Sequence, residues 1–264
     1  MSVMMDEVLQ KIVDIAKEAG EILLGAREIG GSVEAKSGKA NFVTAYDKRV
    51  QDFLFGRLAQ VLPEAVFIGE EEETHAALPE GYAFIVDPID GTTNFMKGYC
   101  TSSISIGLLR AGNPELGVVY NPYLREVFHA VKGKGAFRNG IPIHVSEHGI
   151  EEGIVIFGTA PYYEELAEKS FRYVYRLFRQ CLDVRRSGSS AIDVCNVACG
   201  RAELFFELML SPWDYAASSL ILMEAGGVIA DAQGGALTYD GMHGVVAGNE
   251  KNVRIFEEIR RELS

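Results

Sequence analysis

The sequence lacks three features that would assign it to a well-defined class: a long apolar stretch, a run of basic residues and a CxxC pair. Its longest segment without Asp, Glu, Lys or Arg, from Gly98 to Leu109, has 12 residues. A membrane-spanning helix needs about 20 apolar residues, so we expect no contact with a membrane. Acidic residues also interrupt the first 24 positions, where a secretory signal would have an uninterrupted apolar segment. We therefore expect a cytoplasmic protein.

The cysteines do not form a recognisable metal site. Cys195 and Cys199 lie four residues apart on an expected helix, but no histidine is near them to complete a zinc site. Cys100 and Cys181 stand alone in the sequence. All four lie among apolar residues, so we expect buried, reduced thiols.

Positive charge is scarce as well. The chain has 25 Lys and Arg residues against 37 Asp and Glu residues, which gives a formal net charge of −12. Such a chain is poorly suited to binding nucleic acid or anionic lipid through its own charge, and we expect no direct contact with nucleic acid. If it binds a phosphorylated molecule, a metal ion is the natural source of positive charge.

The composition is that of an ordinary globular protein. Hydrophobic residues make up 48% of the 264 positions and charged residues 23%, which excludes a disordered chain. The length admits one large domain or two lobes that share a core. No internal repeat or low-complexity linker separates the halves.

The spacing of apolar residues predicts a mixed fold. Helices are expected over residues 8–23, 47–62, 162–179, 189–198, 215–225 and 253–263. Strands are expected over residues 66–68, 83–86, 103–109, 116–120, 127–131, 154–157, 182–184, 202–206, 228–230 and 245–247. We expect residues 1–150 to form helices and an antiparallel sheet, and residues 151–264 to form a mixed α/β half of the same compact unit.

The strongest local signal is segment 87–94, Asp-Pro-Ile-Asp-Gly-Thr-Thr-Asn, which directly follows an apolar strand. Its two carboxylates can converge if the chain turns between them, and Pro88 favours a turn because it fixes φ and has no donor. Gly91 and the threonines after it are typical of a helix start, where backbone N–H groups can hold a phosphate. Oxygen ligands without histidine favour Mg²⁺, Mn²⁺ or Ca²⁺. The alternative is a polar turn in which Asp90 caps the helix.

Two further acidic segments accompany this one. Glu70 is the first of four acidic residues after strand 66–68, and it is the one placed to point into a site; the others are typical of a solvated loop. Asp214 follows Pro212-Trp213 and precedes an apolar helix, which we expect it to cap. Each is ordinary alone, but with Asp87 and Asp90 they become candidate metal ligands.

These segments, in this order, resemble the signatures of the inositol monophosphatase family of Mg²⁺-dependent, lithium-sensitive sugar phosphatases. Residues 85–95 match the first signature, and residues 212–217 through 224–227 match the second. Gly69-Glu70-Glu71 and residues 43–47 also fit, so the resemblance covers nearly the whole chain. It implies an α+β fold, a layered αβαβα sandwich of the sugar-phosphatase type, whose first half carries most metal ligands and whose second half carries Asp214 and the sugar pocket.

The resemblance also implies a set of metal ligands. One ion would take Glu70, Asp87 and the backbone carbonyl of Ile89, and a second would take Asp87, Asp90 and Asp214. Two or three Mg²⁺ ions are implied, with Mn²⁺ as a substitute. Such a pair of ions neutralises the phosphate, activates water and stabilises the leaving alkoxide.

Catalytic roles follow from the same resemblance. Glu70 and Thr92 would orient the attacking water, and Asp47 would bind the Thr92 hydroxyl. Lys36 matches a loop lysine near the metals. The phosphate would also contact the N–H groups of Gly91 and Thr92.

Substrate recognition is implied at a glycine-led helix start and at an acid before the second signature. The implied substrate-binding set is Asp90, Gly91, Thr92, Gly188, Ser189, Ser190, Glu207 and Asp214. Glu207 could accept hydrogen bonds from polyol hydroxyls, or it could simply end strand 204–206. One of Arg185 and Arg186 could touch the site, but we expect a solvated pair.

Two positions depart from the family pattern. Asn41 stands where the family often has an acid, and this change would alter a loop without removing a metal ligand. Ser190 replaces a commonly smaller residue, which adds a hydroxyl close to the sugar pocket. The identity of the substrate is therefore open.

We expect a Mg²⁺-dependent phosphomonoesterase that hydrolyses myo-inositol 1-phosphate, or a similar polyol or sugar monophosphate, with metal-activated water. The resemblance also implies a lithium-sensitive homodimer that acts on a small phosphate ester. The alternatives are a fructose-1,6-bisphosphatase, a histidinol-phosphatase or a nucleotide phosphatase of the same superfamily, or a regulatory binding protein that keeps the metal site. A glycosidase with paired carboxylates fits less well, because it leaves Glu70 and Asp214 without a role.

One other motif is weak. Residues 132–135, Lys-Gly-Lys-Gly, could be taken for a phosphate-binding loop, but they lack the Gly-Lys-Ser/Thr ending of a P-loop. They predict a hairpin turn instead.

Overall fold

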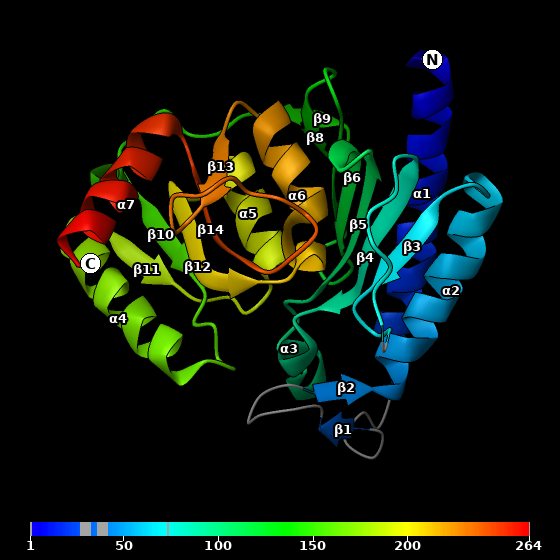
Figure 1. The fold of residues 1–264 in the computed structure, drawn as a ribbon, viewed down its shortest axis with the longest axis horizontal. Helices are drawn as coiled ribbons and strands as arrows, with labels where there is room; N and C mark the ends of the chain where they lie inside the picture. The colour runs from blue at the N-terminus through cyan, green and yellow to red at the C-terminus, as the bar shows by residue number, and fades with distance from the viewer. Residues whose placement is uncertain (1, 27–32, 36–41, 73, 264) are drawn as a thin grey trace.

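The computed structural model describes residues 2–26, 33–35, 42–72 and 74–263 (Figure 1). Lys36 and Asn41 therefore lie outside the described residues. The helices of the described chain are α1 (Ser2–Leu24), α2 (Ala45–Val61), α3 (Thr92–Lys97), α4 (Glu164–Phe178), α5 (Ser190–Ala198), α6 (Pro212–Glu224) and α7 (Glu250–Glu262), with a 3-10 helix, η2 (Ile150–Glu152).

Two large sheets organise the molecule. The seven-stranded sheet contains, in spatial order, β3 (Val66–Gly69), β4 (Tyr82–Asp90), β5 (Ser103–Arg110), β6 (Asn113–Asn121), β7 (Glu126–Val131), β8 (Ala136–Arg138) and β9 (Ile141–Ile143). Its pairs are antiparallel except β3 with β4, which are parallel.

The five-stranded sheet contains, in spatial order, β11 (Asp183–Arg185), β10 (Ile154–Phe157), β12 (Leu204–Leu210), β14 (His243–Gly248) and β13 (Val228–Asp231). Its first three strands run parallel, and β13 and β14 pair antiparallel. A separate two-stranded ladder joins β1 (Val33–Ala35) to β2 (Phe42–Thr44).

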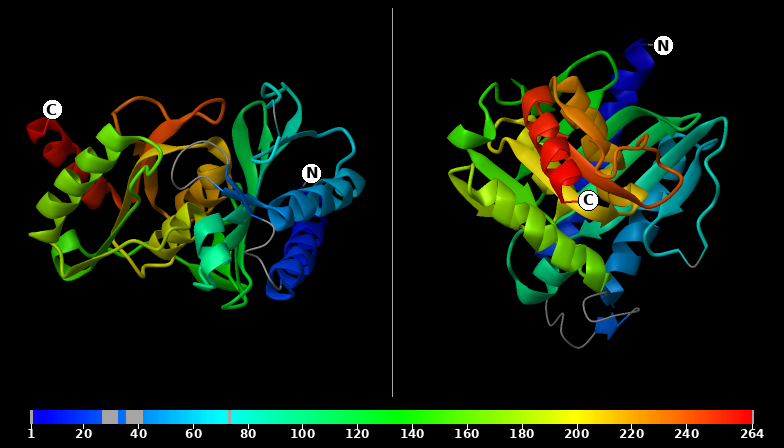
Figure 2. Two further views of the ribbon diagram at one scale, coloured as in Figure 1. Left: turned by 90° about the horizontal axis from the view of Figure 1, so that it is seen from below. Right: turned by 60° about the vertical axis from the view of Figure 1, so that its left-hand side comes forward.

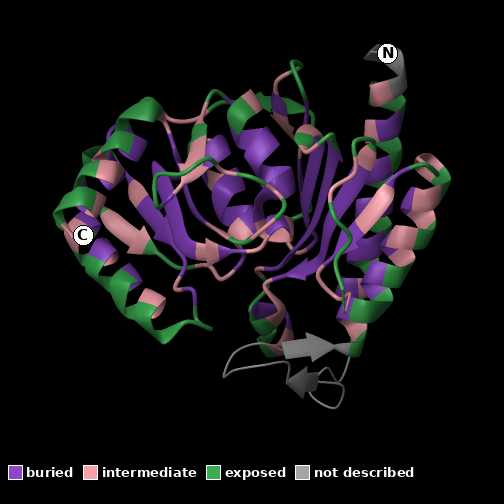
Figure 3. Ribbon diagram, in the orientation of Figure 1, coloured by how far each residue is buried: buried purple, intermediate pink, exposed green. Residues whose placement is uncertain are grey.

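Helices and sheets alternate in five layers (Figures 1 and 2). Helices α1 and α2 cover the outer face of the seven-stranded sheet, α5 and α6 lie between the two sheets, and α4 and α7 cover the outer face of the five-stranded sheet. Both sheets and the two central helices are largely buried (Figure 3). The expected α+β fold with αβαβα layers is confirmed.

The apolar spacing that predicted the helices also forms the cores between these layers. Val8, Ile12, Ile15, Ala19 and Leu23 are buried along one face of α1 and pack in a cluster with strands of the first sheet. A second cluster joins α5 and α6 to both sheets, and a third joins the second sheet to α4 and α7. The seven-stranded sheet draws on residues 66–143 and the five-stranded sheet on residues 154–248; a division near residue 150 stays a prediction.

Two glycines let α6 lie close against the first sheet. A Cβ atom on Gly117 of β6 would lie 2.3 Å from the carbonyl oxygen of Ala217, and one on Gly107 of β5 would lie 3.1 Å from Ala216 Cβ. A side chain at either position would push the helix away. This close packing fixes the start of α6, and therefore Asp214, over the end of β4.

The structure corrects several sequence expectations. Strand β4 continues to Asp90 instead of ending at Val86, β12 continues through Glu207 to Leu210, and β8 and β9 were not expected. Cys100 is exposed instead of buried; the chain forms no disulfide among the described residues.

The hairpin turn expected at residues 132–135 is confirmed between β7 and β8. The Glu224 carboxylate at the end of α6 accepts hydrogen bonds from the N–H groups of Gly133 and Gly135, at 2.7 and 2.8 Å. These amides therefore bind a carboxylate of the chain itself. In the described part of the chain, no helix has the length and apolar character needed to span a bilayer.

Candidate metal centre and active site

Asp87 and Asp90 approach one another because β4 is irregular at its end. In a regular strand, residues three apart point to opposite faces. The register with β5 shifts between Asp87 and Asp90, which is the behaviour of a β-bulge. Pro88, which has no N–H to donate, lies in this segment, and the Asp87 carboxylate accepts a hydrogen bond from Ile89 N at 2.9 Å. The convergence that we expected from a turn comes from this irregularity.

Asp214 reaches the same place from the other side, on the first turn of α6. We expected it to cap this helix, but Ser211 is the N-cap and Asp214 is the third helical residue of a capping box. Its carboxylate accepts a hydrogen bond from Ser211 N at 2.7 Å. This bond orients the side chain toward β4.

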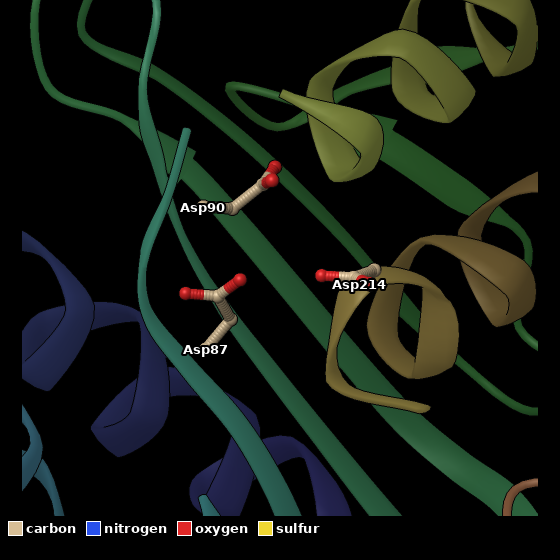
Figure 4. Close-up of side chains that lie close together, drawn as sticks. All are labelled: Asp87, Asp90 and Asp214. Carbon is tan, nitrogen blue, oxygen red and sulfur yellow. The ribbon is translucent and has the colours of Figure 1, made fainter. Parts of the chain in front are cut away.

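The three aspartates form one cluster (Figure 4). One carboxylate oxygen from each of Asp87, Asp90 and Asp214 lies within 4.8 Å of the others. Burial raises the pKa of Asp87 well above its usual range, and repulsion from Glu70, Asp90 and Asp214 raises it further. Burial, then repulsion from Asp90 and Glu70, also raises the pKa of Asp214. An all-oxygen cluster with this much uncompensated charge fits a hard divalent cation.

Glu70 lies at the end of β3, next to this cluster. The parallel pairing of β3 with β4 places Gly69 opposite Val86, and Glu70 N donates to Val86 O at 3.3 Å. A Cβ atom on Gly69 would lie 2.3 Å from Gln51 Oε1, so a larger residue would displace the Gln51 side chain. Gln51 in turn accepts a hydrogen bond from Glu71 N at 3.0 Å. The start of the acidic loop is thus fixed, and Glu70 lines the same cavity as the aspartates.

Thr92 opens helix α3 directly after the metal cluster. Its hydroxyl lies 3.2 Å from Asp47 Oδ1 and 3.2 Å from the carbonyl oxygen of Ile89. The hydroxyl proton serves these acceptors, so the oxygen lone pairs remain available on the cavity side. Asp47 is fully buried in the first turn of α2. The Gly91 N-cap has φ +92°, and a Cβ atom there would lie 2.9 Å from Gly188 O.

Asp90 does not cap the helix that follows it, as one sequence interpretation allowed. Its carboxylate accepts hydrogen bonds from Ser190 N at 3.1 Å and Ala191 N at 2.9 Å, at the start of α5. The hydroxyls of Ser103 and Ser189 donate to the same carboxylate. Burial raises the pKa of Asp90, and these hydrogen bonds oppose that rise. Asp90 therefore joins the first sheet to a central helix.

Glu207 is buried on β12 and faces the start of α5. Its two carboxylate oxygens accept hydrogen bonds from Ala160 N at 2.9 Å and from the Ser190 hydroxyl at 3.1 Å. A Cβ atom on Gly158 would lie 1.9 Å from Glu207 Oε2, so the carboxylate needs a glycine beside it. A carboxylate offers about four acceptor positions, and two of them remain for a ligand. Glu207 does not end its strand.

These residues line one cavity of about 340 Å³ that contains all the described candidates except Asp47. A larger groove of about 760 Å³ lies along Trp213 on the neighbouring surface, and its walls are mostly apolar. It contains none of the three clustered aspartates. The smaller cavity is therefore the candidate active site.

The family model for the inositol monophosphatase family matches residues 4–264. The chain belongs to the inositol monophosphatase family. Members of this family are metal-dependent phosphatases, so the protein is a phosphoric monoester hydrolase. The acidic cluster lies where the two family signatures meet in space.

Individual relatives agree with this assignment. The chain is 35% identical to "Nus factor SuhB" of Salmonella typhimurium over 263 residues, 98% of each chain. It is 38% identical to "Inositol monophosphatase 2" of Solanum lycopersicum over 237 residues, 87% of this chain and 89% of the relative. Among solved structures, inositol monophosphatase from Anabaena superposes with a TM-score of 0.85 at 30% identity, covering 98% of this chain and 96% of the other.

The cavity also contains residues that the sequence did not single out. Asp193 is buried on α5, three residues after Ser190, where helical periodicity would have placed it on the same face. Tyr162 and Met242 come from loops, where no periodicity signals their direction. Arg186 is exposed and also lines the cavity, which agrees with the alternative that one of the two arginines touches the site. Lys36, expected near the metals, lies outside the described residues.

Proposed function

We propose that the protein is a Mg²⁺-dependent phosphomonoesterase that hydrolyses myo-inositol 1-phosphate or a similar polyol or sugar monophosphate. The observation that supports it most is the cluster of Asp87, Asp90 and Asp214 beside the start of α3. An acidic cavity cannot hold a phosphate dianion by itself. It can do so once cations occupy the carboxylates.

The ligand set that we propose for these cations is the one that the family resemblance implies, and the cluster of Asp87, Asp90 and Asp214 supports its second half. Glu70, Asp87 and the carbonyl of Ile89 would hold one ion, and Asp87, Asp90 and Asp214 would hold a second. Two such ions neutralise the phosphate, lower the pKa of a bound water and stabilise the leaving alkoxide. We propose Mg²⁺, with Mn²⁺ as a substitute and room for a third ion, because the donor set is all oxygen.

The chain's own residues place the reactants. Thr92 and Glu70 orient the attacking water, since the Thr92 proton is engaged by Asp47 or Ile89 and its lone pairs can accept from the water. The N–H groups of Gly91 and Thr92 at the start of α3 contact the phosphate. Lys36 is included in this proposal on the family resemblance alone.

The leaving group would lie over α5 and β12. Glu207 would accept hydrogen bonds from vicinal hydroxyls, with Gly188 and Ser190 beside it. Ser189 would act through Asp90, because its hydroxyl donates to that carboxylate and its N–H donates to Ser187. The substrate oxygen nearest the scissile bond would contact Asp90 and Asp214.

The test is a panel of phosphate esters assayed with Mg²⁺ and with EDTA. It contains myo-inositol 1-phosphate, fructose 1,6-bisphosphate, histidinol phosphate, 2′-AMP and p-nitrophenyl phosphate. We expect turnover that requires Mg²⁺ and is fastest for the polyol or sugar esters. Undiminished turnover in EDTA would contradict the metal assignment, and a clear preference for histidinol phosphate or 2′-AMP would replace the polyol assignment. Li⁺ titrated at fixed Mg²⁺ should inhibit at millimolar concentrations.

A regulatory role is the second candidate, because relatives at 35% identity carry the name "Nus factor SuhB". Such a protein would keep the metal cluster and bind a protein partner. A chain of net charge −12 is still poorly suited to direct contact with nucleic acid. We also propose a cytoplasmic homodimer, for which the exposed apolar face of α4 is the candidate contact.

A further inference from the structure

The wall of the active-site cavity carries one cation among the residues that the structure describes. Arg186 is that residue. Six acids share the cavity with it: Glu70, Asp87, Asp90, Asp193, Glu207 and Asp214. A lone guanidinium in such a setting would ordinarily form an ion pair with one of these carboxylates.

Arg186 forms no such pair. No described carboxylate lies within 4.0 Å of its guanidinium nitrogens, and its nearest polar contact is the Thr159 hydroxyl at 3.5 Å. The preceding residue behaves differently, because Arg185 forms an ion pair with Asp183 and does not line the cavity. Apart from the long hydrogen bond to Thr159, the described residues therefore engage none of the Arg186 donors.

The position of Arg186 lies on the leaving-group side of the cavity. Its Nη1 would be 2.9 Å from a Cβ atom on Gly188, so the glycine leaves the guanidinium room beside the start of α5. Its charge lowers the pKa of Glu207 and Asp193, against the larger effect of burial. Arg186 therefore lies beside Glu207 and Asp193, on the side of the cavity where we place the leaving group.

A guanidinium presents a rigid fork of donors that matches a phosphate or a carboxylate. Because the scissile phosphate already has a place at the aspartate cluster, a second fork on the leaving-group side serves a second anion. We propose that Arg186 selects sugar or polyol phosphates that carry a second anionic group, a phosphate or a carboxylate, on the leaving group. The inference rests on the proposed phosphatase function and adds to its substrate class the esters that carry a second anion, bisphosphates included.

The acids beside Arg186 repel a second anion less strongly than their number suggests. Burial raises the pKa of Asp193 well above its usual range, which favours its neutral form. Glu207 is engaged by Ala160 N and the Ser190 hydroxyl. The local charge beside Arg186 is thus close to balanced before a ligand binds.

The experiment compares fructose 1,6-bisphosphate with fructose 1-phosphate, which share the scissile ester and differ in the second phosphate. A charge-assisted hydrogen bond contributes about 1.5–3 kcal/mol, which corresponds to roughly 10- to 150-fold. We expect kcat/KM of the native protein to be at least tenfold higher for the bisphosphate. In Arg186→Gln this ratio should fall at least tenfold, whereas Arg186→Lys should restore part of it.

Arg185→Gln is the matched control, since it removes an adjacent guanidinium that points elsewhere; its ratio should match that of the native protein. A native ratio near one, or an equal fall of the ratio in both glutamine variants, would overturn the assignment. Hydrolysis of p-nitrophenyl phosphate with Mg²⁺ is measured in parallel. If the native protein does not hydrolyse that ester, the proposed function itself fails. If it does, the ratio of the two kcat/KM values tests the role of Arg186 alone.

Discussion

Asp87 is the residue at which the proposed metal assignment can be tested most directly. Four other acids raise its pKa after burial has done so, and two proposed ions would share it. We expect Asp87→Asn to lower kcat/KM about a thousandfold, or on the order of 4 kcal/mol, because it removes a ligand from both ions. Isothermal titration with Mg²⁺ should show weaker binding in the same variant.

Asp183→Asn, on the surface strand β11, serves as the control for a lost carboxylate and should keep native activity. Near-native turnover in Asp87→Asn would remove the metal assignment.

Glu207 offers the test of polyol recognition. Two of its acceptor positions are occupied by Ala160 N and the Ser190 hydroxyl, and the other two face the cavity. We expect Glu207→Ala to lower kcat/KM for myo-inositol 1-phosphate at least tenfold more than for p-nitrophenyl phosphate, which lacks neighbouring hydroxyls. Equal losses on both esters would mean that Glu207 supports the fold or the metals. Steady-state kinetics on the two esters gives the ratio.

Asp193 is the residue through which pH should act on stability. Its Oδ1 has no hydrogen-bond partner among the described residues, and burial raises its pKa well above its usual range. The native state therefore holds this proton more tightly than the unfolded state. The resulting stability is complete below the unfolded pKa of about 3.9 and is lost as pH rises through the native pKa.

Asp193→Asn keeps the neutral shape, so its unfolding free energy should exceed that of the native protein more at pH 8 than at pH 5. The gain at pH 8 arises because the amide cannot ionise, and it amounts to about 1.4 kcal/mol for each unit by which the native pKa exceeds the unfolded one, up to that pH. Urea unfolding at the two pH values measures it. Asp183→Asn should show no such gain, because Arg185 lowers the pKa of Asp183. A pH-independent difference for Asp193→Asn would contradict this account.

Among the elements, the position of helix α6 depends on the glycines of the first sheet that face it. A Cβ atom on Gly117 would overlap the Ala217 carbonyl at 2.3 Å. Gly117→Ala should destabilise the protein by about 1–3 kcal/mol through overpacking, and it should weaken Mg²⁺ binding because α6 carries Asp214. Gly56→Ala, on the exposed face of α2 with no atom within 4 Å, should instead stabilise by roughly 0.5–1 kcal/mol. Thermal unfolding of both variants distinguishes a packing effect from a general intolerance of alanine.

The sequence predicted elements better than it predicted their ends. Periodicity located α1 and β6 because the residues that set it are near neighbours in the chain. The irregular end of β4 depends on pairing with β5, and the extension of β12 depends on pairing with β14. Those partners are distant in sequence, so no local pattern contains them.

The candidate site, like the fold, could be predicted from the sequence only in part. The motif around Asp87 and Asp90 was visible because its residues are contiguous. The hydrogen bonds from the start of α5 to Asp90 span about 100 positions. Arg186 and Asp193 could be assigned to the cavity only once the strands and helices were in place.

At the scale of the whole molecule, one exposed apolar surface is a candidate contact between two copies of the chain. The exposed apolar residues here termed the α4 stripe are Phe171, Tyr175 and Phe178, which recur at helical spacing on α4, and Leu182 just after the helix; they are 57, 61, 50 and 68% exposed. An apolar stripe of this kind commonly marks a protein–protein contact. We expect a homodimer by sedimentation, and the double variant Tyr175→Glu/Phe178→Glu should sediment as a monomer.

Ile141→Glu is the matched control, because Ile141 is a similarly exposed apolar residue, on β9. A native protein that sediments as a monomer would remove the dimer proposal.

Asp90 has two roles, and together they limit which substitutions the site can tolerate. Its carboxylate belongs to the proposed ion cluster and also accepts the N–H groups of Ser190 and Ala191 at the start of α5. A lost ion ligand can be offset by a higher concentration of the ion. A helix start left without its acceptor cannot be restored by anything in solution. Losing Asp90 would therefore be beyond full rescue by added ions, because the start of α5 would stay without its acceptor.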